Sequence, residues 1–186
     1  MRVPALLLVM LTAACAGSPA PLQDLAGPSE VPPTGEIKLS GAGEFSPSDT
    51  SAIVYDRKLV PRGAQASAAV ESSGNKTRTS LVVEGMLPNH RYGAHLHTKP
   101  CGAKPDESGP HYQHHRGEVS PTSEVWLDVT TNGDGAGRSS ARNDWALDPA
   151  DLPGSLVIHS QGTKTSGPEV GTAGTRVACL TLKKTS

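Results

Sequence analysis

The segment Tyr92-Gly93-Ala94-His95-Leu96-His97 predicts a β-strand that carries two histidines on one of its faces. Side chains on a strand alternate between its two faces, so His95 and His97 point the same way. A second run, Ser155-Leu156-Val157-Ile158-His159, also has strand character and ends on a histidine. We therefore expect imidazoles from different strands to converge on one site. Imidazole is a suitable ligand for copper, zinc, iron and nickel.

Short β-prone runs separated by turn sequences extend along the rest of the chain. No long segment has the 3.6-residue periodicity of a helix. Aromatic residues make up only 3% of the chain, so the core must rest on Val, Leu, Ile and Ala. The pattern predicts an all-β domain of about eight strands, a sandwich or a Greek-key barrel. The runs are residues 52–55, 66–70, 79–83, 92–97, 125–130, 137–141, 155–159 and 176–182.

Two connections are longer than ordinary hairpin loops, and each follows a strand that ends on a histidine. One spans residues 98–124 and the other spans residues 160–175. Long ordered loops are often functional. We therefore expect the site to lie at the end of the domain where these two loops meet.

The first residues of the chain have the features of an export signal. Residues 1–15 combine a basic start with a short apolar run and end in small residues before Cys15. This pattern favours a signal peptide with a lipobox-like end, in which Cys15 carries lipid. The alternative is a plain signal peptide whose cysteine is discarded. Residues 16–35 are rich in Pro, Ala and Gly and are typical of a flexible tether, which leaves residues 36–186 as one domain.

Composition and cysteine usage narrow the partners and the compartment. The formal net charge of −1 does not favour nucleic acid, and contact with a membrane is expected only through a lipid on Cys15. Export implies an oxidising compartment, so Cys101 and Cys179 are expected to form a disulfide. The alternative is two buried free thiols.

Several segments occur together in a characteristic order. They are Gly93-Ala94-His95-Leu96-His97-Thr98-Lys99-Pro100-Cys101-Gly102, then Gly109-Pro110-His111, then Ser155-Leu156-Val157-Ile158-His159, then Gly171-Thr172-Ala173-Gly174-Thr175-Arg176-Val177-Ala178-Cys179. Across roughly residues 50–183 the chain resembles the copper/zinc superoxide dismutase family in its bacterial secreted form. The resemblance implies an eight-stranded Greek-key β-barrel, which is an immunoglobulin-like sandwich.

The resemblance also assigns roles to particular residues. It implies that copper is held by four histidines: His95, His97, His111 and His159. His111 takes the place of the family's zinc-bridging histidine and is expected to supply a proton. Arg176 would attract the superoxide anion beside the copper. Cys101 and Cys179 match the family disulfide.

The expected zinc half of the site departs from the family pattern. The loop Tyr112-Gln113-His114-His115-Arg116-Gly117-Glu118 is short and lacks the family's further zinc ligands at their usual spacing. His114 and His115 are at best weak metal ligands and are more typical of solvated loop residues. Copper is therefore the expected metal, zinc is doubtful, and His111 needs another group on its second ring nitrogen. Asp148, Asp151 and Glu118 are candidates for that group.

Three functions remain open on sequence alone. The first is an exported superoxide dismutase that uses copper alone at the cell envelope, with superoxide as its substrate. The second is a non-catalytic copper-binding or copper-carrying envelope protein. The third is a structural envelope domain without metal. The sequence does not indicate an oligomeric state.

Overall fold

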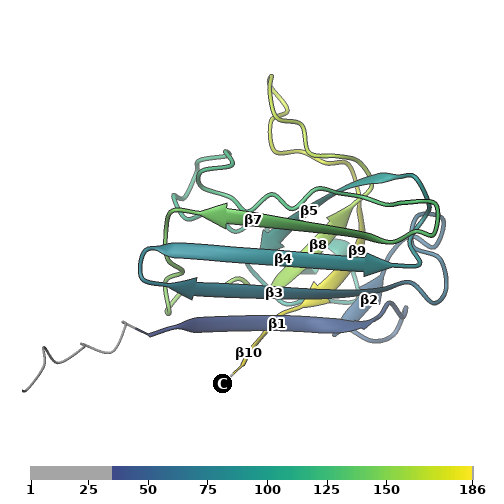
Figure 1. Cartoon of the computed structure of the whole chain (residues 1–186), viewed down its shortest axis with the longest axis horizontal. Helices are drawn as coiled ribbons and strands as arrows, with labels where there is room; N and C mark the ends of the chain where they lie inside the picture. The colour runs from purple at the N-terminus through teal and green to yellow at the C-terminus, as the bar shows by residue number, and fades with distance from the viewer. Residues whose placement is uncertain (1–34, 186) are drawn as a thin grey trace, which may run out of the picture. The chain divides into compact units, whose positions relative to one another are not determined.

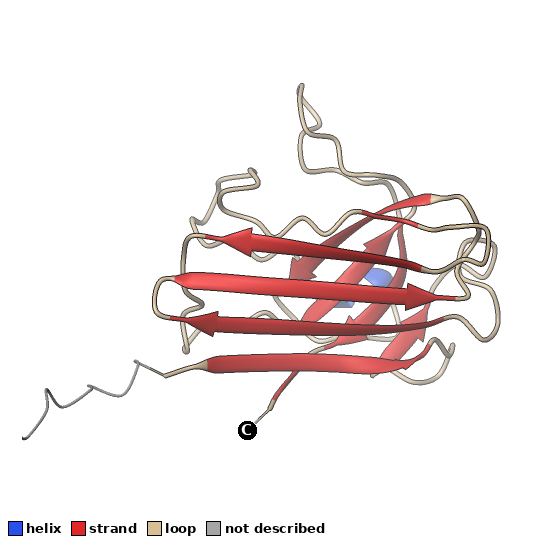
Figure 2. Ribbon diagram, viewed as in Figure 1, coloured by secondary structure: helices blue, strands red, loops and turns tan. Residues whose placement is uncertain are grey.

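A computed structural model of the protein describes residues 35–185, which form two antiparallel five-stranded sheets packed as an immunoglobulin-like sandwich (Figure 1). The predicted signal peptide of residues 1–15, Cys15 and nearly all of the predicted tether of residues 16–35 lie outside the described residues. Within residues 35–185, the one helical element is a short 3-10 turn, η1 (Pro105–Ser108), so none of them forms a helix able to span a membrane (Figure 2).

The first sheet is a regular surface with one buried and one exposed face. Its strands follow the order β10-β1-β3-β4-β7. Side chains alternate between buried and exposed positions along its two central strands, as expected for a sheet with one face on the core. The bounds are β1 (Ile37–Glu44), β3 (Gln65–Ser73), β4 (Lys76–Glu84), β7 (Gly137–Asn143) and β10 (Lys183–Lys184).

The second sheet carries the histidines and is buried much more completely. Its strands follow the order β2-β9-β8-β5-β6 and lie behind the first sheet in Figure 1. Every residue of β8 is buried, as is every residue of β5 after Arg91, because loops cover the sheet's outer face. The bounds are β2 (Ala52–Val54), β5 (Arg91–His97), β6 (Val129–Thr130), β8 (Ser155–His159) and β9 (Arg176–Thr181).

Strand register brings three of the four histidines to one face. In the β5–β8 ladder Gly93 pairs with His159, and His95 pairs with Val157. Because Gly93, His95 and His97 lie on the same side of β5, His159 lies on that side too. Across the next ladder, Arg176 at the start of β9 pairs with His159, with a register irregularity at this point.

The predictions of an all-β fold and of an immunoglobulin-like sandwich are confirmed, but the expected closure into an eight-stranded barrel is wrong. Residues 35–185 form ten strands, and their two sheets are not closed into a barrel. The sequence analysis missed β1, whose glycines weaken its strand pattern. Gly41 is required there, because an added Cβ would lie 2.4 Å from the backbone oxygen of Thr181. The predicted strand 125–130 is regular only at Val129–Thr130.

A disulfide joins the first long loop to the second sheet. Cys101 bonds to Cys179 of β9 across a sequence separation of 78, and both side chains are buried. They pack in a small cluster with Ile53 and Val157, separate from the main core between the sheets. The disulfide expected from the sequence is therefore present, and it attaches the loop that carries His111 close to Arg176.

Replacing both cysteines should destabilise the domain without changing its topology. Cross-linking restricts the unfolded chain, and a loop of 78 residues corresponds to about 4–5 kcal/mol in the chain-entropy description. We expect the double variant C101S/C179S to unfold at a markedly lower urea concentration than the oxidised protein. Reduced wild-type protein should behave like the variant. Equal midpoints for all three would contradict the expectation.

Candidate metal centre

The four predicted histidines meet in one buried cluster. One ring nitrogen from each of His95, His97, His111 and His159 lies within 4.8 Å of the other three. Within residues 35–185 this is the single group of three or more potential metal-ligating side chains. Nδ1 of His95 lies 3.1 Å from Nε2 of His111, and the Nε2 atoms of His97 and His159 are 3.4 Å apart.

Backbone carbonyls determine which nitrogen faces inward on two of the rings. Nδ1 of His97 lies 2.9 Å from the oxygen of Gly109, and Nδ1 of His159 lies 3.4 Å from the oxygen of Gly174. A carbonyl oxygen only accepts hydrogen bonds, so each Nδ1 carries the hydrogen. Nε2 of both rings is therefore left with a lone pair directed into the cluster.

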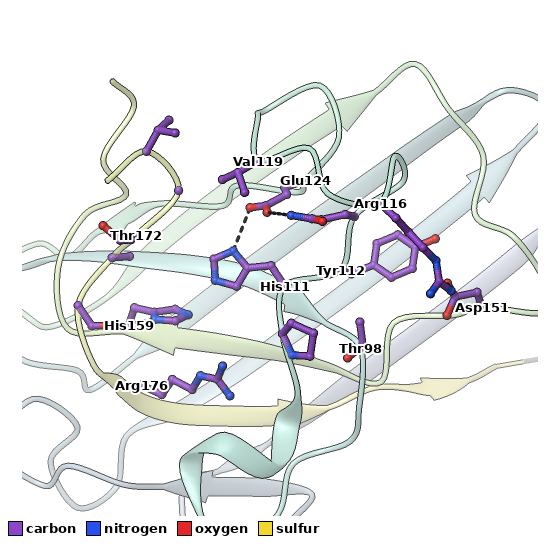
Figure 3. Close-up of a pocket in the computed structure, with 16 residues that line it drawn as sticks. Thr98, His111, Tyr112, Arg116, Val119, Glu124, Asp151, His159, Thr172 and Arg176 are labelled. Carbon is purple, nitrogen blue, oxygen red and sulfur yellow. Dashed lines mark hydrogen bonds and ion pairs between the residues drawn. The ribbon is translucent and has the colours of Figure 1, made fainter. Parts of the chain in front are cut away.

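A carboxylate determines which ring nitrogen of His111 faces inward. Nδ1 of His111 donates to Oε2 of Glu124 over 2.9 Å, as Figure 3 shows. Glu124 is 1% exposed, and it also accepts hydrogen bonds from Gln113 and from the indole of Trp126, each 2.8 Å long. Burial raises the pKa of Glu124, but these three hydrogen bonds together outweigh it and leave the pKa below its usual value. Glu124 is therefore an ionised acceptor.

The segment that carries Glu124 is attached to both sheets. Isolated backbone bridges join His97 to His111, His95 to Trp126, and Gln113 to Glu124. From the end of β7, the Asn143 amide donates to the Glu124 carbonyl over 3.2 Å. This framework places the carboxylate beside His111 without relying on a flexible loop.

His95 is fully buried, and its Nδ1, in place of Nε2, faces the cluster. Its Nδ1 faces the cluster, while its Nε2 lies 2.7 Å from the hydroxyl of Thr163. His95 and His97 are both fully shielded from solvent. Each of the four imidazoles thus has one nitrogen against an outside partner and the other toward a shared centre.

Burial keeps the rings of His95, His97 and His159 neutral. Desolvation, followed by the neighbouring His111, lowers the pKa of His97 to about 2 and that of His159 to about 4. The same causes, with the other histidines adding to them, hold the pKa of His95 well below its ordinary value. Four imidazoles that each direct one ring nitrogen at a shared centre are a donor set that copper or zinc fits.

A guanidinium and an open cavity lie next to the cluster. Nη1 of Arg176 donates to the oxygen of Pro105 over 2.8 Å and to the hydroxyl of Ser108 over 2.9 Å, both in η1. Arg176, His111 and His159 line the same cavity of about 760 Å³, and Figure 3 shows them grouped together. The walls come from both long connections, so these loops do meet at the site as the sequence analysis expected.

The other predicted residues lie elsewhere. His114 and His115 are outside the four-histidine cluster, and His114 stacks on Trp145 with ring centroids 4.8 Å apart. The proposal of Asp148, Asp151 or Glu118 as partner of His111 is wrong. Asp151 pairs with Arg116, and Glu118 accepts hydrogen bonds from nearby hydroxyls. Asp148 forms a backbone bridge to Asp151.

Sequence reasoning missed Glu124, although a signal was present. Glu124 and Trp126 alternate with the apolar residues Val125 and Leu127, both of which are buried in the core. An alternating run of this kind directs Glu124 and Trp126 to the opposite face, which is the face that carries His95. The predicted strand began at Val125, so Glu124 was assigned to the preceding loop.

The fold and the cluster together define an immunoglobulin-like β-sandwich with a four-histidine candidate metal centre. The fold is similar to that of the Cu/Zn superoxide dismutase from Brucella abortus, with a TM-score of 0.50. The alignment covers 78% of this chain and 96% of that chain at 18% sequence identity. At this level of identity the similarity is evidence for the fold alone. No protein-family model matches the chain, and no curated protein matches it in sequence.

The metal-free protein should lose stability as the pH falls below 6.5. The folded pKa values of His97 and His159, about 2 and about 4, lie below the unfolded value of 6.5. Their stabilising effect is therefore fully present above pH 6.5 and is lost as the pH falls toward the folded values. Between pH 6.5 and 5.5 each should reduce the free energy of unfolding by about 1 kcal/mol.

Urea unfolding of chelator-treated protein at several pH values measures this effect. His159→Gln removes one titrating ring and should give a shallower pH dependence than wild type. A free energy of unfolding that stays constant from pH 7.5 to 5.5 would rule out the neutral buried cluster.

Glu124→Gln should weaken metal binding. A neutral amide holds the Nδ1 hydrogen of His111 less firmly, and loss of such a partner typically costs 10–100-fold in metal affinity. Competition with a chelator of known affinity measures the change for Cu(II). Glu118→Gln is the matched control, because it alters a carboxylate of the same loop that hydrogen-bonds to Ser120 and Thr122 instead. Equal affinities for the two variants would refute the role of Glu124.

Proposed function

We propose that this protein is a superoxide dismutase that works with copper alone. The observation that carries the proposal is the set of four imidazoles that each direct one ring nitrogen at one centre. The similarity of the fold to a Cu/Zn superoxide dismutase supports it. In the overall reaction, two superoxide anions and two protons give one molecule of oxygen and one of hydrogen peroxide.

Copper, when bound, would supply one-electron chemistry by alternating between Cu(II) and Cu(I). His95, His97, His111 and His159 would hold it. Zinc cannot change its oxidation state and so could not replace copper in this role. The carboxylate of Glu124 supports a site without zinc, because it takes the second nitrogen of His111 that a zinc ion would otherwise occupy.

Arg176 would bind and orient the anion. Its guanidinium is fixed through one nitrogen by two acceptors of η1, and it lines the cavity beside His111 and His159. Its positive charge also lowers the pKa of both His97 and His159, after the larger effects of burial and His111. A fixed cation at the wall of a cavity raises the local concentration of a small anion.

His111 would move the proton. Its side chain is 21% exposed and borders the cavity, whereas the other three histidines are buried. Glu124 holds the hydrogen on Nδ1, so Nε2 is the atom that would take a proton from the cavity and pass it to the departing peroxide, and it would do so only while it does not hold copper. The carboxylate would stabilise the imidazolium that forms in between.

His159→Ala and Arg176→Ala should separate metal binding from turnover. His159→Ala removes a ligand and should lose both copper and activity above free-copper controls. Arg176→Ala should keep copper but lose about tenfold or more in rate, with a weaker salt dependence, because steering of the anion is lost. Metal analysis and a superoxide decay assay on the same samples measure both quantities.

The second candidate is a copper-carrying protein without turnover, and the open cavity of about 760 Å³ favours it, because this space far exceeds a diatomic anion. A carrier should be indifferent to Arg176→Ala. Lys164→Ala is the matched control, because this exposed cation of the second loop pairs with Glu169. Copper-loaded wild-type protein with no activity above free copper would reject the enzyme. Protein from copper-sufficient cells that contains no metal would reject both candidates.

The place of action is proposed from the sequence. We infer export to the cell envelope, with a lipid on Cys15 as the anchor. The Cys101–Cys179 disulfide supports export, because such bonds persist in oxidising compartments.

A further inference from the structure

A chain of side chains continues outward from His95. Thr163, in the second long loop, places its hydroxyl 2.7 Å from Nε2 of His95. The same hydroxyl makes a short hydrogen bond to Oδ1 of Asp128, and the backbone N–H of Thr163 donates to Oδ2 of Asp128 over 2.8 Å. His95 is fully buried and Thr163 is 7% exposed, so solvent has little access to this chain.

The direction of the hydrogen bonds follows from the number of hydrogens available. A carboxylate can only accept, and a hydroxyl has one hydrogen to donate. With that hydrogen committed to Asp128, the Thr163 oxygen can only accept from His95. Nε2 must then carry the ring hydrogen of His95, and Nδ1 keeps the lone pair that faces the cluster.

This arrangement sets His95 apart from the other three ligands. His97 and His159 meet backbone carbonyls, and His111 meets a carboxylate directly. The Thr163 hydroxyl could either donate a hydrogen bond to His95 or accept one from it, so the direction of this hydrogen bond depends on Asp128. The direction of this hydrogen bond matters because, in the opposite tautomer, Nδ1 of His95 would carry its hydrogen into the cluster. That N–H would repel a cation and could not bind it.

The chain of hydrogen bonds from His95 through Thr163 to Asp128, here called the relay, is held in place by the backbone at Gly93. Its N–H donates to the oxygen of Gln161 over 2.6 Å, which attaches the second loop to β5. An added Cβ at Gly93 would lie 2.5 Å from Cβ of Ala173 and 3.0 Å from the Thr163 hydroxyl. The loop can therefore rest directly on the strand that carries His95 only because this position has no side chain.

We propose that Asp128 and Thr163 are positioning residues of the histidine centre, which set the tautomer of His95 and connect the second loop to the metal. The proposal rests on the proposed function in that the centre binds copper. Neither residue touches the shared centre, and both act through His95.

The test uses the full chain and four variants. Thr163→Val removes the hydroxyl at nearly constant shape, Thr163→Ser restores it, and Asp128→Asn introduces an amide that can donate to the hydroxyl and reverse the relay. Arg91→Ala is the control, because it removes a mostly exposed partner of Asp128 without touching Thr163. Two quantities are measured: the tautomer of His95 in metal-free protein, by long-range proton–nitrogen NMR correlation, and Cu(II) affinity, by chelator competition.

Wild type, Thr163→Ser and Arg91→Ala should show the hydrogen on Nε2 of His95 and similar copper affinities. Thr163→Val and Asp128→Asn should show hydrogen on Nδ1 in part or all of the molecules and bind Cu(II) about 10–100-fold more weakly. An unchanged tautomer in Asp128→Asn, or unchanged affinity in both variants, would overturn the proposal. If wild type shows the expected tautomer but binds no copper, Asp128 and Thr163 still set the tautomer of His95, and it is the proposed function that fails.

Discussion

Burial of four imidazoles against one another is the constraint on which the rest of the structure depends. A positive charge on His95, His97 or His159 would lack water and would face neighbouring imidazoles, so these three rings stay neutral. Neutral rings must each place one hydrogen, and the protein supplies an acceptor for it outside the cluster. The acceptors are two backbone carbonyls, the Glu124 carboxylate and the Thr163 hydroxyl. Ring nitrogens that converge on one centre are the consequence, and such a set of donors suits a metal cation.

The sheets and the two long loops contribute different parts of the histidine site. The second sheet fixes the spacing of His95, His97 and His159 through strand register, which a buried ladder holds firmly. The loops supply what the sheet cannot: the fourth histidine of the cluster, acceptors for the outer ring nitrogens and the walls of the cavity. The disulfide at Cys101 and the contact at Gly93 attach these loops to the sheet, so groups from distant parts of the chain remain in position.

Much of the fold could be read from local pattern, and the misses have physical causes. Strand β8 was predicted with its observed bounds, because a fully buried strand is a continuous apolar run. Strand β1 was missed because Gly41 and Gly43 interrupt the alternation of side chains that is typical of a strand. Gly41 is needed because a side chain at this position would clash with the backbone of Thr181. Closure of a barrel depends on pairing between the outer strands of the sheets, which no local sequence feature specifies.

The sequence alone determined the four histidines, their order along the chain and the strand that places His95 beside His97, because these depend on residue identity and a period of two. It also indicated the disulfide, and the family resemblance implied the role of Arg176 in the proposed chemistry. Only the tertiary structure decided which acidic groups serve the histidines. Glu124 lies 13 residues from His111, and Asp128 reaches His95 through Thr163, which is 35 residues from Asp128. Such pairings depend on how loops pack over a sheet, and the sequence nearby had favoured Asp148, Asp151 and Glu118 equally well.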